Sequence, residues 1–249
     1  MEVIVISKLL FYVMKELFIL FGGGLMVEGN KIYELIISKM KCYPSTIVGI
    51  TDISYSYYSK QYKCALILAV PHREIISLNN YSEEKFEKTI SATREELNAI
   101  ISDLLTVLQE YKINYYVPPV AQTNEESLIA LFSFKYSAIN AGIGWIGKNG
   151  VLVTKEYGPR IRLSAILIDY DLPVGIPITK SMCDEKCFLC IEACPHKALK
   201  GIQWDIYKLR EQLIDYQLCN FKRSLYLKKY NRKNACGFCI VACPLGLRV

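Results

Sequence analysis

The chain carries the run CDEKCFLCIEACP at residues 183–195 and the run CGFCIVACP at residues 236–244, and each run ends in Cys-Pro. A further cysteine, Cys219, stands alone between them. Eight of the ten cysteines therefore fall within residues 183–243. Thiols at such short spacing indicate metal ligation, because one tight turn of backbone can direct several sulfurs at one centre.

The two runs are close to the bacterial two-cluster ferredoxin pattern, C-x₂-C-x₂-C-x₃-C-P, in which the fourth cysteine of each run ligates the other run's cluster. Carried across, this pattern predicts two [4Fe–4S] clusters. One set of ligands would be Cys183, Cys187, Cys190 and Cys243, and the other would be Cys219, Cys236, Cys239 and Cys194. The first spacing is x₃ rather than x₂, and sixteen residues separate Cys219 from Cys236, so each departure requires a longer local loop.

Two other uses of the cysteines stay open. Zinc takes four ligands from pairs of C-x₂₋₄-C, so eight cysteines could hold two zinc ions, although the C-x₃-C-P endings favour clusters. A disulfide framework would need an oxidising compartment, and the first residues do not match a signal peptide. The remaining Cys42 and Cys64 lie in mixed apolar sequence and are predicted to be inert packing residues.

Composition predicts a globular protein with a sizeable core. The chain has 249 residues, of which 52% are hydrophobic and 22% charged, and its net charge is +6. This mild basic bias permits an anionic partner without requiring one. Residues 1–25 are an apolar extension interrupted by charges, so we expect no stable membrane insertion. The extension is either an amphipathic helix or sequence ahead of a natural start at Met26, and we favour the second.

Hydrophobic patterns predict an α/β core domain over residues 26–172. Continuous apolar runs indicate buried strands at 64–70 and 161–168, and shorter strands are expected at 46–50, 115–117 and 151–154. Helical periodicity predicts helices at 30–40, 82–111 and 125–140, with Ser82 as the cap of the longest. Residues 173–179 are rich in Pro and Gly, so we place a domain boundary there, with a small second domain over 173–249 and a helix at 204–227.

The second informative stretch is AGIGWIGKNGVLVTKEYGPRIRLSAILID, at residues 141–169. Its glycines satisfy G-x-G-x-x-G, and Asp169 stands where a ribose-binding acid belongs. A dinucleotide site needs a strand before the motif and a helix after it, whereas the order expected here is the reverse, so we reject that interpretation. The glycines instead allow positive φ angles and a close approach of backbone to a large ligand.

Basic residues are concentrated between and around the cysteine runs. Residues 197–233 contain ten Lys and Arg residues against Asp205, Glu211 and Asp215. Such an excess is most often a solvated face. It could also neutralise acidic clusters, dock an acidic electron donor or contact phosphates.

The glycine stretch followed by the cysteine runs resembles the corrinoid iron–sulfur reductases, namely the epoxyqueuosine reductases and, more distantly, the reductive dehalogenases. The GWIGKN core is similar to the epoxyqueuosine reductase version, and the EYGPR loop is similar to the dehalogenase version. The resemblance extends from about Met26 to the C-terminus and is specific at these two blocks.

The resemblance implies a nitroreductase-like cobalamin-binding domain followed by a small ferredoxin-like domain with two [4Fe–4S] clusters. It implies a reductase in which electrons pass through the clusters to the corrin cobalt, with an acidic ferredoxin or flavodoxin as donor, a cytoplasmic location and tRNA as a candidate partner. No histidine ligand is implied, and His196 is expected to be structural. The residues implied to line the corrin face are Gly142, Gly144, Trp145, Gly147, Lys148, Asn149, Gly150, Tyr157, Gly158, Pro159 and Arg160.

Three departures leave the substrate and the catalytic residue unassigned. The acidic proton donor of the epoxyqueuosine reductases would fall at Leu128, with Glu125 and Glu126 close by. A helical-repeat extension does not follow Cys243, and a twin-Arg signal is not found. An alternative function is electron transfer by a ferredoxin module that is fused to a flavin-binding or partner-binding domain. As a cofactor, flavin is less favoured than cobalamin. A third hypothesis is a zinc-stabilised RNA-binding protein.

Overall fold

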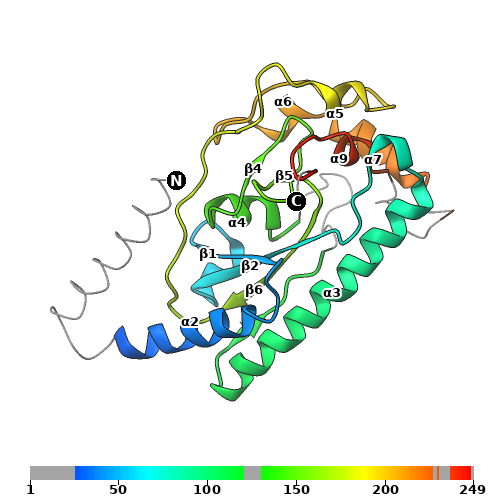
Figure 1. Ribbon diagram of the computed structural model, residues 1–249. Helices are drawn as coiled ribbons and strands as arrows, with labels where there is room; N and C mark the ends of the chain where they lie inside the picture. The colour runs from blue at the N-terminus through cyan, green and yellow to red at the C-terminus, as the bar shows by residue number, and fades with distance from the viewer. Residues whose placement is uncertain (1–25, 121–129, 227–228, 230–235, 248–249) are drawn as a thin grey trace, which may run out of the picture.

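A four-stranded antiparallel sheet forms the centre of the computed structural model, which describes residues 26–120, 130–226, 229 and 236–247 (Figure 1). The strand order is β1-β2-β6-β3. The strands are β1 (Ile47–Asp52), β2 (Cys64–Pro71), β6 (Ile161–Ile168) and β3 (Tyr115–Tyr116). All three neighbouring pairs are antiparallel, so the protein has mixed helical and sheet content around an antiparallel core.

The two central strands confirm the predicted buried runs. Every residue of β2 is buried, and β2 pairs with β6 from Cys64↔Ile168 to Pro71↔Ile161. Their near-continuous apolar sequences fit strands that are covered on both faces. Leu66 and Leu68 face one core cluster, whereas Ile67 faces the other.

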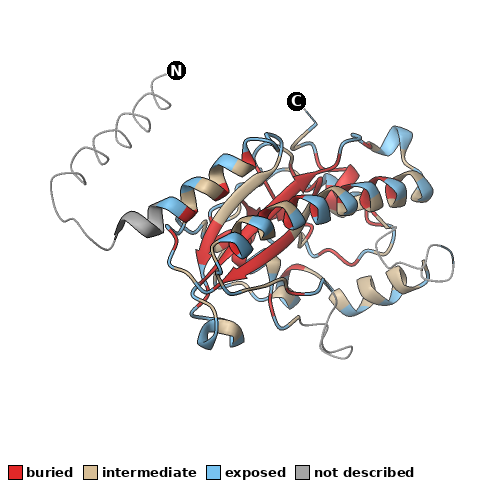
Figure 2. Ribbon diagram, turned by 90° about the horizontal axis from the view of Figure 1, so that it is seen from below, coloured by how far each residue is buried: buried red, intermediate tan, exposed pale blue. Residues whose placement is uncertain are grey.

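Two helices cover one face of the sheet, α2 (Met26–Met40) and α3 (Glu83–Glu110). In Figure 2 the long α3 shows buried and exposed bands in turn as it crosses the buried strands. Its buried stripe includes Leu97, Ile100 and Leu104, which share a core cluster with Leu66 and Leu68. The predicted amphipathic helix is therefore confirmed.

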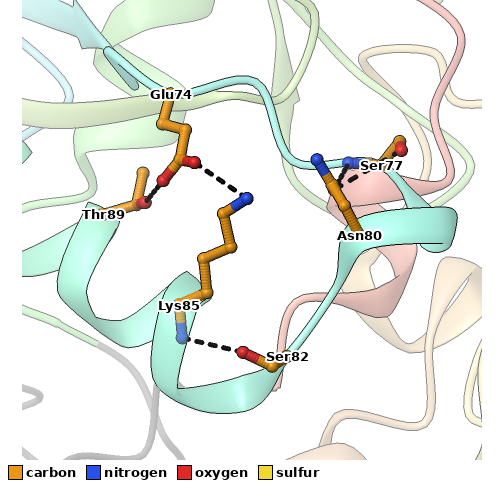
Figure 3. Close-up of polar contacts among 6 residues, drawn as sticks. All are labelled: Glu74, Ser77, Asn80, Ser82, Lys85 and Thr89. Atoms are coloured by element: carbon orange, nitrogen blue, oxygen red, sulfur yellow. Dashed lines mark hydrogen bonds and ion pairs between the residues drawn. The ribbon is translucent and has the colours of Figure 1, made fainter.

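The start of α3 is fixed to the segment that follows β2 (Figure 3). Ser82 is the N-cap, as predicted, and its Oγ accepts a hydrogen bond from the backbone N–H of Lys85 at 3.1 Å. The Nζ of Lys85 lies 2.8 Å from Oε1 of Glu74, and Thr89 Oγ1 donates to Oε2 of the same carboxylate at 3.5 Å. A short 3₁₀ turn, η2 (Leu78–Asn80), connects these two parts.

The other face carries the glycine stretch and the cysteine segment. Residues of α4 (Phe134–Asn140) and of the two-stranded sheet β4 (Trp145–Ile146) and β5 (Leu152–Val153) pack there. Beyond them lie four short helices, α5 (Leu189–Glu192), α6 (Arg210–Leu213), α7 (Tyr216–Ser224) and α9 (Phe238–Val241), which gather on one side in Figure 1. Trp204 and Leu213 join the core cluster of β4 and β5.

The predicted boundary segment, residues 173–179, follows the core as an extended chain. Gly175 N donates to the carbonyl oxygen of Ile50 at 2.8 Å, and Ile178 N donates to that of Ile139 at 3.1 Å. The division into domains at residue 173 stays a prediction. In the described residues no helix is long and apolar enough to cross a membrane.

Two predicted helices were wrong in part. Residues 130–133 are not helical, because Ser133 caps α4 by accepting a hydrogen bond from Tyr136 N at 3.3 Å. Residues 121–129 lie outside the described residues, and with them the predicted acid positions Glu125, Glu126 and Leu128. The helix expected at 204–227 is instead α6 and α7, because Ile214 is extended and Asp215 caps α7.

The cysteines outside the runs differ from each other. Cys64 is buried in β2, as expected of a packing residue, and its Sγ donates to the carbonyl oxygen of Tyr170 at 3.2 Å. Cys42 is exposed, so its predicted packing role was wrong. It follows the end of α2 in a turn, where the side chain faces solvent. The N-terminal extension, residues 1–25, lies outside the described residues.

Candidate functional site

The eight clustered cysteines lie near one another, and their neighbouring thiols fall largely into two sets. Cys190 lies near Cys243, Cys183 and Cys187; burial raises the pKa of its thiol to about 12, and these three neighbours add to the effect. Burial also raises the pKa of Cys239, and the neighbouring thiols Cys236, Cys219, Cys190 and Cys194 add to the effect. Cys219 and Cys236 both lie near Cys194.

These sets match the grouping of the crossed pattern, and their binding of two clusters stays a prediction. We call Cys183, Cys187, Cys190 and Cys243 the first thiol group, and Cys194, Cys219, Cys236 and Cys239 the second thiol group. All ten cysteines of the chain are free thiols in the structure. Within the described residues, no three His, Cys, Asp or Glu side chains converge tightly enough to hold a single metal ion.

The crossing follows from two short helices with the same design. Cys190 lies within α5 and Cys194 just after it, while Cys239 lies within α9 and Cys243 just after it. At the end of each helix the backbone N–H of the second cysteine donates a 3.2 Å hydrogen bond. Cys194 N donates to the carbonyl oxygen of Ile191, and Cys243 N donates to that of Ile240. The proline that follows cannot donate to a further turn, so the helix ends there. Each helix therefore gives one thiol to its own group and the next thiol to the other group.

A cavity of about 760 Å³ lies between the core and the cysteine segment. All four cysteines of the second thiol group line it, together with Asn149–Leu152, Ile161–Leu163 and Ser133–Lys135 from the core. Known ligand pockets span roughly 300–1,000 Å³, so the cavity has the size of a cofactor or substrate site. The first thiol group does not contribute to the described wall.

Among the charged side chains of the cavity wall, basic ones predominate. They are Arg94, Lys135, Arg162, Arg210 and Arg223, against Glu211 as the one acidic side chain among the described lining residues. Lys135 borders the open cavity and donates from Nζ to the carbonyl oxygen of Gly150 at 2.9 Å. Desolvation lowers the pKa of Lys135 to about 8, and the charges of Arg210 and Arg223 add to this. The cavity therefore suits an anionic ligand or a negatively charged metal cluster.

The residues implied to line the corrin face occupy several environments. Asn149, Gly150 and Pro159 line the cavity. Trp145 is buried in the core cluster behind it. At Gly144 a Cβ would overlap the carbonyl oxygen of Val153, so this glycine permits a close approach of backbone to backbone within the protein. His196 also lines the cavity, and burial lowers its pKa.

Lys148 holds the loop of the first cysteine run. It is 4% exposed, and its Nζ donates to the carbonyl oxygens of Asp184 at 3.0 Å, Glu185 at 2.8 Å and Cys187 at 3.1 Å. The ammonium also lies 4.3 Å from the ring centroid of Phe188. An ammonium has three N–H donors, so these three contacts use its full capacity.

Arg160 holds the loop of the second run in the same way. It is 3% exposed and donates from Nη1 to the carbonyl oxygen of Leu245 at 2.7 Å, and from Nη2 to those of Val241 at 3.0 Å and Cys243 at 2.8 Å. Asn149, also 3% exposed, donates from Nδ2 to the carbonyl oxygen of Cys239 at 3.2 Å. Sequence reasoning missed these contacts, because the acceptors are backbone carbonyls that no residue type marks.

Comparison with known proteins links both the sequence and the fold to two enzyme families. The epoxyqueuosine reductase of Lactococcus garvieae is 33% identical over 112 residues, which is 43% of this chain and 30% of that protein. The tetrachloroethene reductive dehalogenase of Dehalobacter restrictus is 27% identical over 130 residues, which is 51% of this chain and 21% of that protein. The resemblance to these reductases is confirmed. No family model matches the chain.

Solved structures give the same answer for the fold. An epoxyqueuosine reductase from Streptococcus thermophilus has a TM-score of 0.57 at 18% identity, with 88% of this chain and 67% of that chain covered. A reductive dehalogenase described as acting by B12-dependent dehalogenation has a TM-score of 0.62 at 16% identity, with 90% and 33% covered. The chain thus shares a fold with both families while spanning less than a third of the length of the first curated relatives.

Proposed function

We propose that the chain is a reductase that uses two [4Fe–4S] clusters and a cobalamin, with chemistry like that of the epoxyqueuosine reductases. The observation that carries the proposal is the position of the second thiol group, whose four cysteines all line the large basic cavity. On this proposal a nitroreductase-like domain over residues 26–172 supplies one wall of the cavity, and a ferredoxin-like domain over 173–249 supplies the other.

The donor set fits iron–sulfur clusters. Each thiol group has four cysteines, and [4Fe–4S] clusters are held by four cysteine thiolates. The buried thiols would have to release protons on binding, because thiolates are the metal ligands. When bound, the clusters would supply low-potential electrons, and the cobalamin would supply a reducible cobalt.

The core residues would bind and shield the cofactor. Asn149, Gly150 and Pro159 are the members of the predicted corrin face that border the cavity. Phe132, Val151 and Leu152 supply apolar wall, which would exclude water from the reacting groups. Lys135 would orient an anionic group of the substrate or cofactor, since its ammonium is charged below its pKa of about 8.

The partners are proposed from charge and from the relatives. One solved epoxyqueuosine reductase, with a TM-score of 0.56 to this chain, is bound to a tRNA stem loop. We include tRNA as a candidate partner, because basic side chains in residues 197–229 could contact phosphates. The same side chains could dock an acidic ferredoxin or flavodoxin as electron donor. A cytoplasmic location is part of the proposal.

Purification without oxygen, followed by reconstitution with iron, sulfide and cobalamin, tests the proposal. We expect about eight irons and one corrin per chain, with electron paramagnetic resonance signals of reduced [4Fe–4S] clusters and of cob(II)alamin. A protein with eight irons that binds no corrin would contradict the reductase and favour the electron-transfer protein, and a bound flavin would strengthen that alternative. A colourless protein with two zinc ions would favour the RNA-binding hypothesis.

A further inference from the structure

Three buried side chains of the glycine stretch each contact a different part of the cysteine loops. Lys148 contacts the loop that carries Cys183 and Cys187, and Arg160 contacts the loop that carries Cys243. These three cysteines belong to the first thiol group, although they come from opposite ends of the cysteine segment. Asn149 contacts the carbonyl of Cys239, in the second thiol group.

We propose that Lys148, Asn149 and Arg160 form a carbonyl clamp, a set of positioning residues that fixes the cysteine loops to the core and assembles the first thiol group from its two separate loops. The proposal rests on the proposed function only where it concerns the cluster that this group would bind. The resemblance implies a corrin contact for these residues, whereas the structure directs their polar atoms at protein carbonyls.

The energetics favour a positioning role. A buried ammonium or guanidinium is costly unless hydrogen bonds replace its lost water. Lys148 meets this requirement with three carbonyl oxygens, and the two Nη atoms of Arg160 meet it with three more, while its buried Nε has no partner among the described residues. Moving either loop away would leave a buried cation without these acceptors. The loops are therefore confined to the positions that group the thiols, before any metal is bound.

The clamp also leaves positive charge beside the first thiol group. All six acceptors of Lys148 and Arg160 are neutral carbonyl oxygens, so these contacts do not cancel the two charges. A cluster becomes more negative on reduction, and nearby cations stabilise the reduced form. Removing either cation should therefore lower the reduction potential of the cluster in the first thiol group.

Hydrogen exchange of the iron-free full chain tests the clamp without relying on clusters. We expect Lys148→Met to speed exchange at least tenfold in residues 184–187, and Arg160→Met to do so in residues 241–245, while β2 and β6 stay protected. The matched control is Lys155→Met, a substitution of an exposed lysine in the same stretch, which should change neither segment. Unchanged exchange in both segments, or an equal increase throughout the chain, would overturn the proposal.

Redox titration of the reconstituted chain tests the electrostatic part. Cys183→Ala and Cys236→Ala assign the resonance signals to the first and second thiol groups. Lys148→Met should lower the potential of the first cluster and leave that of the second unchanged, whereas Lys148→Arg, which keeps the charge, should restore most of the difference. Equal potentials in Lys148→Met and the unsubstituted chain would refute this part. If the chain takes up no iron, the proposed function fails, and the exchange experiment still decides the clamp.

Discussion

The backbone of Gly158 packs directly against the carbonyl oxygen of Leu245, with no room for a Cβ at position 158. The same oxygen accepts the 2.7 Å hydrogen bond from Nη1 of Arg160. The EYGPR loop therefore contacts the C-terminal cysteine loop in two ways: Gly158 packs closely against it, and the charged Arg160 donates a hydrogen bond to it. This explains why a glycine and an arginine stand two residues apart in that loop.

Substitution Gly158→Ala should destabilise the protein strongly. Gly158 has a φ of 58°, and an alanine in this region costs roughly 1–2 kcal/mol. Overlap with Leu245 would add an overpacking cost of roughly 1–3 kcal/mol. We expect a total loss of about 2–5 kcal/mol in the free energy of unfolding, measured by denaturant titration of the iron-free chain.

Gly150→Ala is the matched control. Gly150 has a similar φ of 70°, but the nearest atom to a Cβ there is Cγ2 of Ile214 at 3.3 Å, on a side chain that can move. This variant should lose only the backbone cost of roughly 1–2 kcal/mol. Equal losses in the two variants would show that the contact with Leu245 does not contribute.

The crossing of the cysteine runs gives a second prediction. Cys194 follows α5, yet it lies with the second thiol group near Cys219 and Cys236. Cys194→Ala should therefore remove the same resonance signal as Cys236→Ala, with a loss of about four irons, and leave the signal that depends on Cys183. Iron analysis and electron paramagnetic resonance after reconstitution measure this.

Cys42→Ala serves as the control, because Cys42 is exposed and distant in sequence from both runs. It should keep the full iron content. If Cys194→Ala instead removed the signal that depends on Cys183, the two runs would bind their clusters without crossing.

Sequence patterns predicted the parts of the fold that depend on burial. The runs of β2 and β6 and the periodic stripe of α3 are apolar because they face the core on one or both sides. The break between α6 and α7 was missed, although Asp215 is a good N-cap residue, because the apolar Ile214 also fits a helix. What fixes Ile214 in an extended conformation is a bridge to Leu199, a tertiary contact that local sequence does not show.

In the candidate site, too, local sequence patterns predicted some features and tertiary contacts determined the others. The cysteine spacing marked these thiols as candidate ligands, since ligand spacing follows from local backbone geometry, and their binding of clusters stays a prediction. The clamp was not predictable in this way, because Lys148 and Arg160 bind main-chain oxygens that every residue possesses. Their burial was the missing information: both are 4% exposed or less, which is rare for cations without partners.

The acidity of Lys135 gives a third prediction. Its pKa of about 8 means that the cavity carries one more positive charge below pH 8 than above it. An anionic ligand should therefore bind more weakly as the pH rises through 8. Nuclear magnetic resonance of the reductively ¹³C-methylated iron-free chain should show a lysine that titrates near pH 8 and that is absent from Lys135→Arg.

Substitution Arg223→Met tests whether nearby positive charge lowers the pKa of Lys135. The charge of Arg223 contributes to the lowered pKa of Lys135, after desolvation at the cavity wall and the charge of Arg210. Removing that charge should raise the pKa of Lys135, so the titration should move to higher pH. An unmoved titration would mean that desolvation and the charge of Arg210 account for the lowered pKa.

The last prediction concerns His72, which is 8% exposed and contacts Phe86 edge-on at a centroid distance of 6.0 Å. Burial, with smaller effects from Arg162 and Arg160, lowers its pKa from 6.5 to about 3. Between these values the unfolded chain binds a proton that the folded chain does not, so stability falls as the pH decreases below 6.5 and is unaffected above it. The folded protein should lose about 1 kcal/mol between pH 6.5 and 5.5 through this residue alone.

His72→Gln removes the titrating group while keeping a neutral polar side chain of similar length. Denaturant titrations of both iron-free chains at pH 7.5, 6.5 and 5.5 isolate the contribution of His72, because the other titrating groups are common to both. The variant should be less stable than the unsubstituted chain at pH 7.5, and the gap should narrow by about 1 kcal/mol between pH 6.5 and 5.5. Parallel pH profiles would mean that His72 titrates alike in the folded and unfolded chains. In that case the imidazole could accept a proton in place, beside two arginines, and its burial would have to relax as the pH falls.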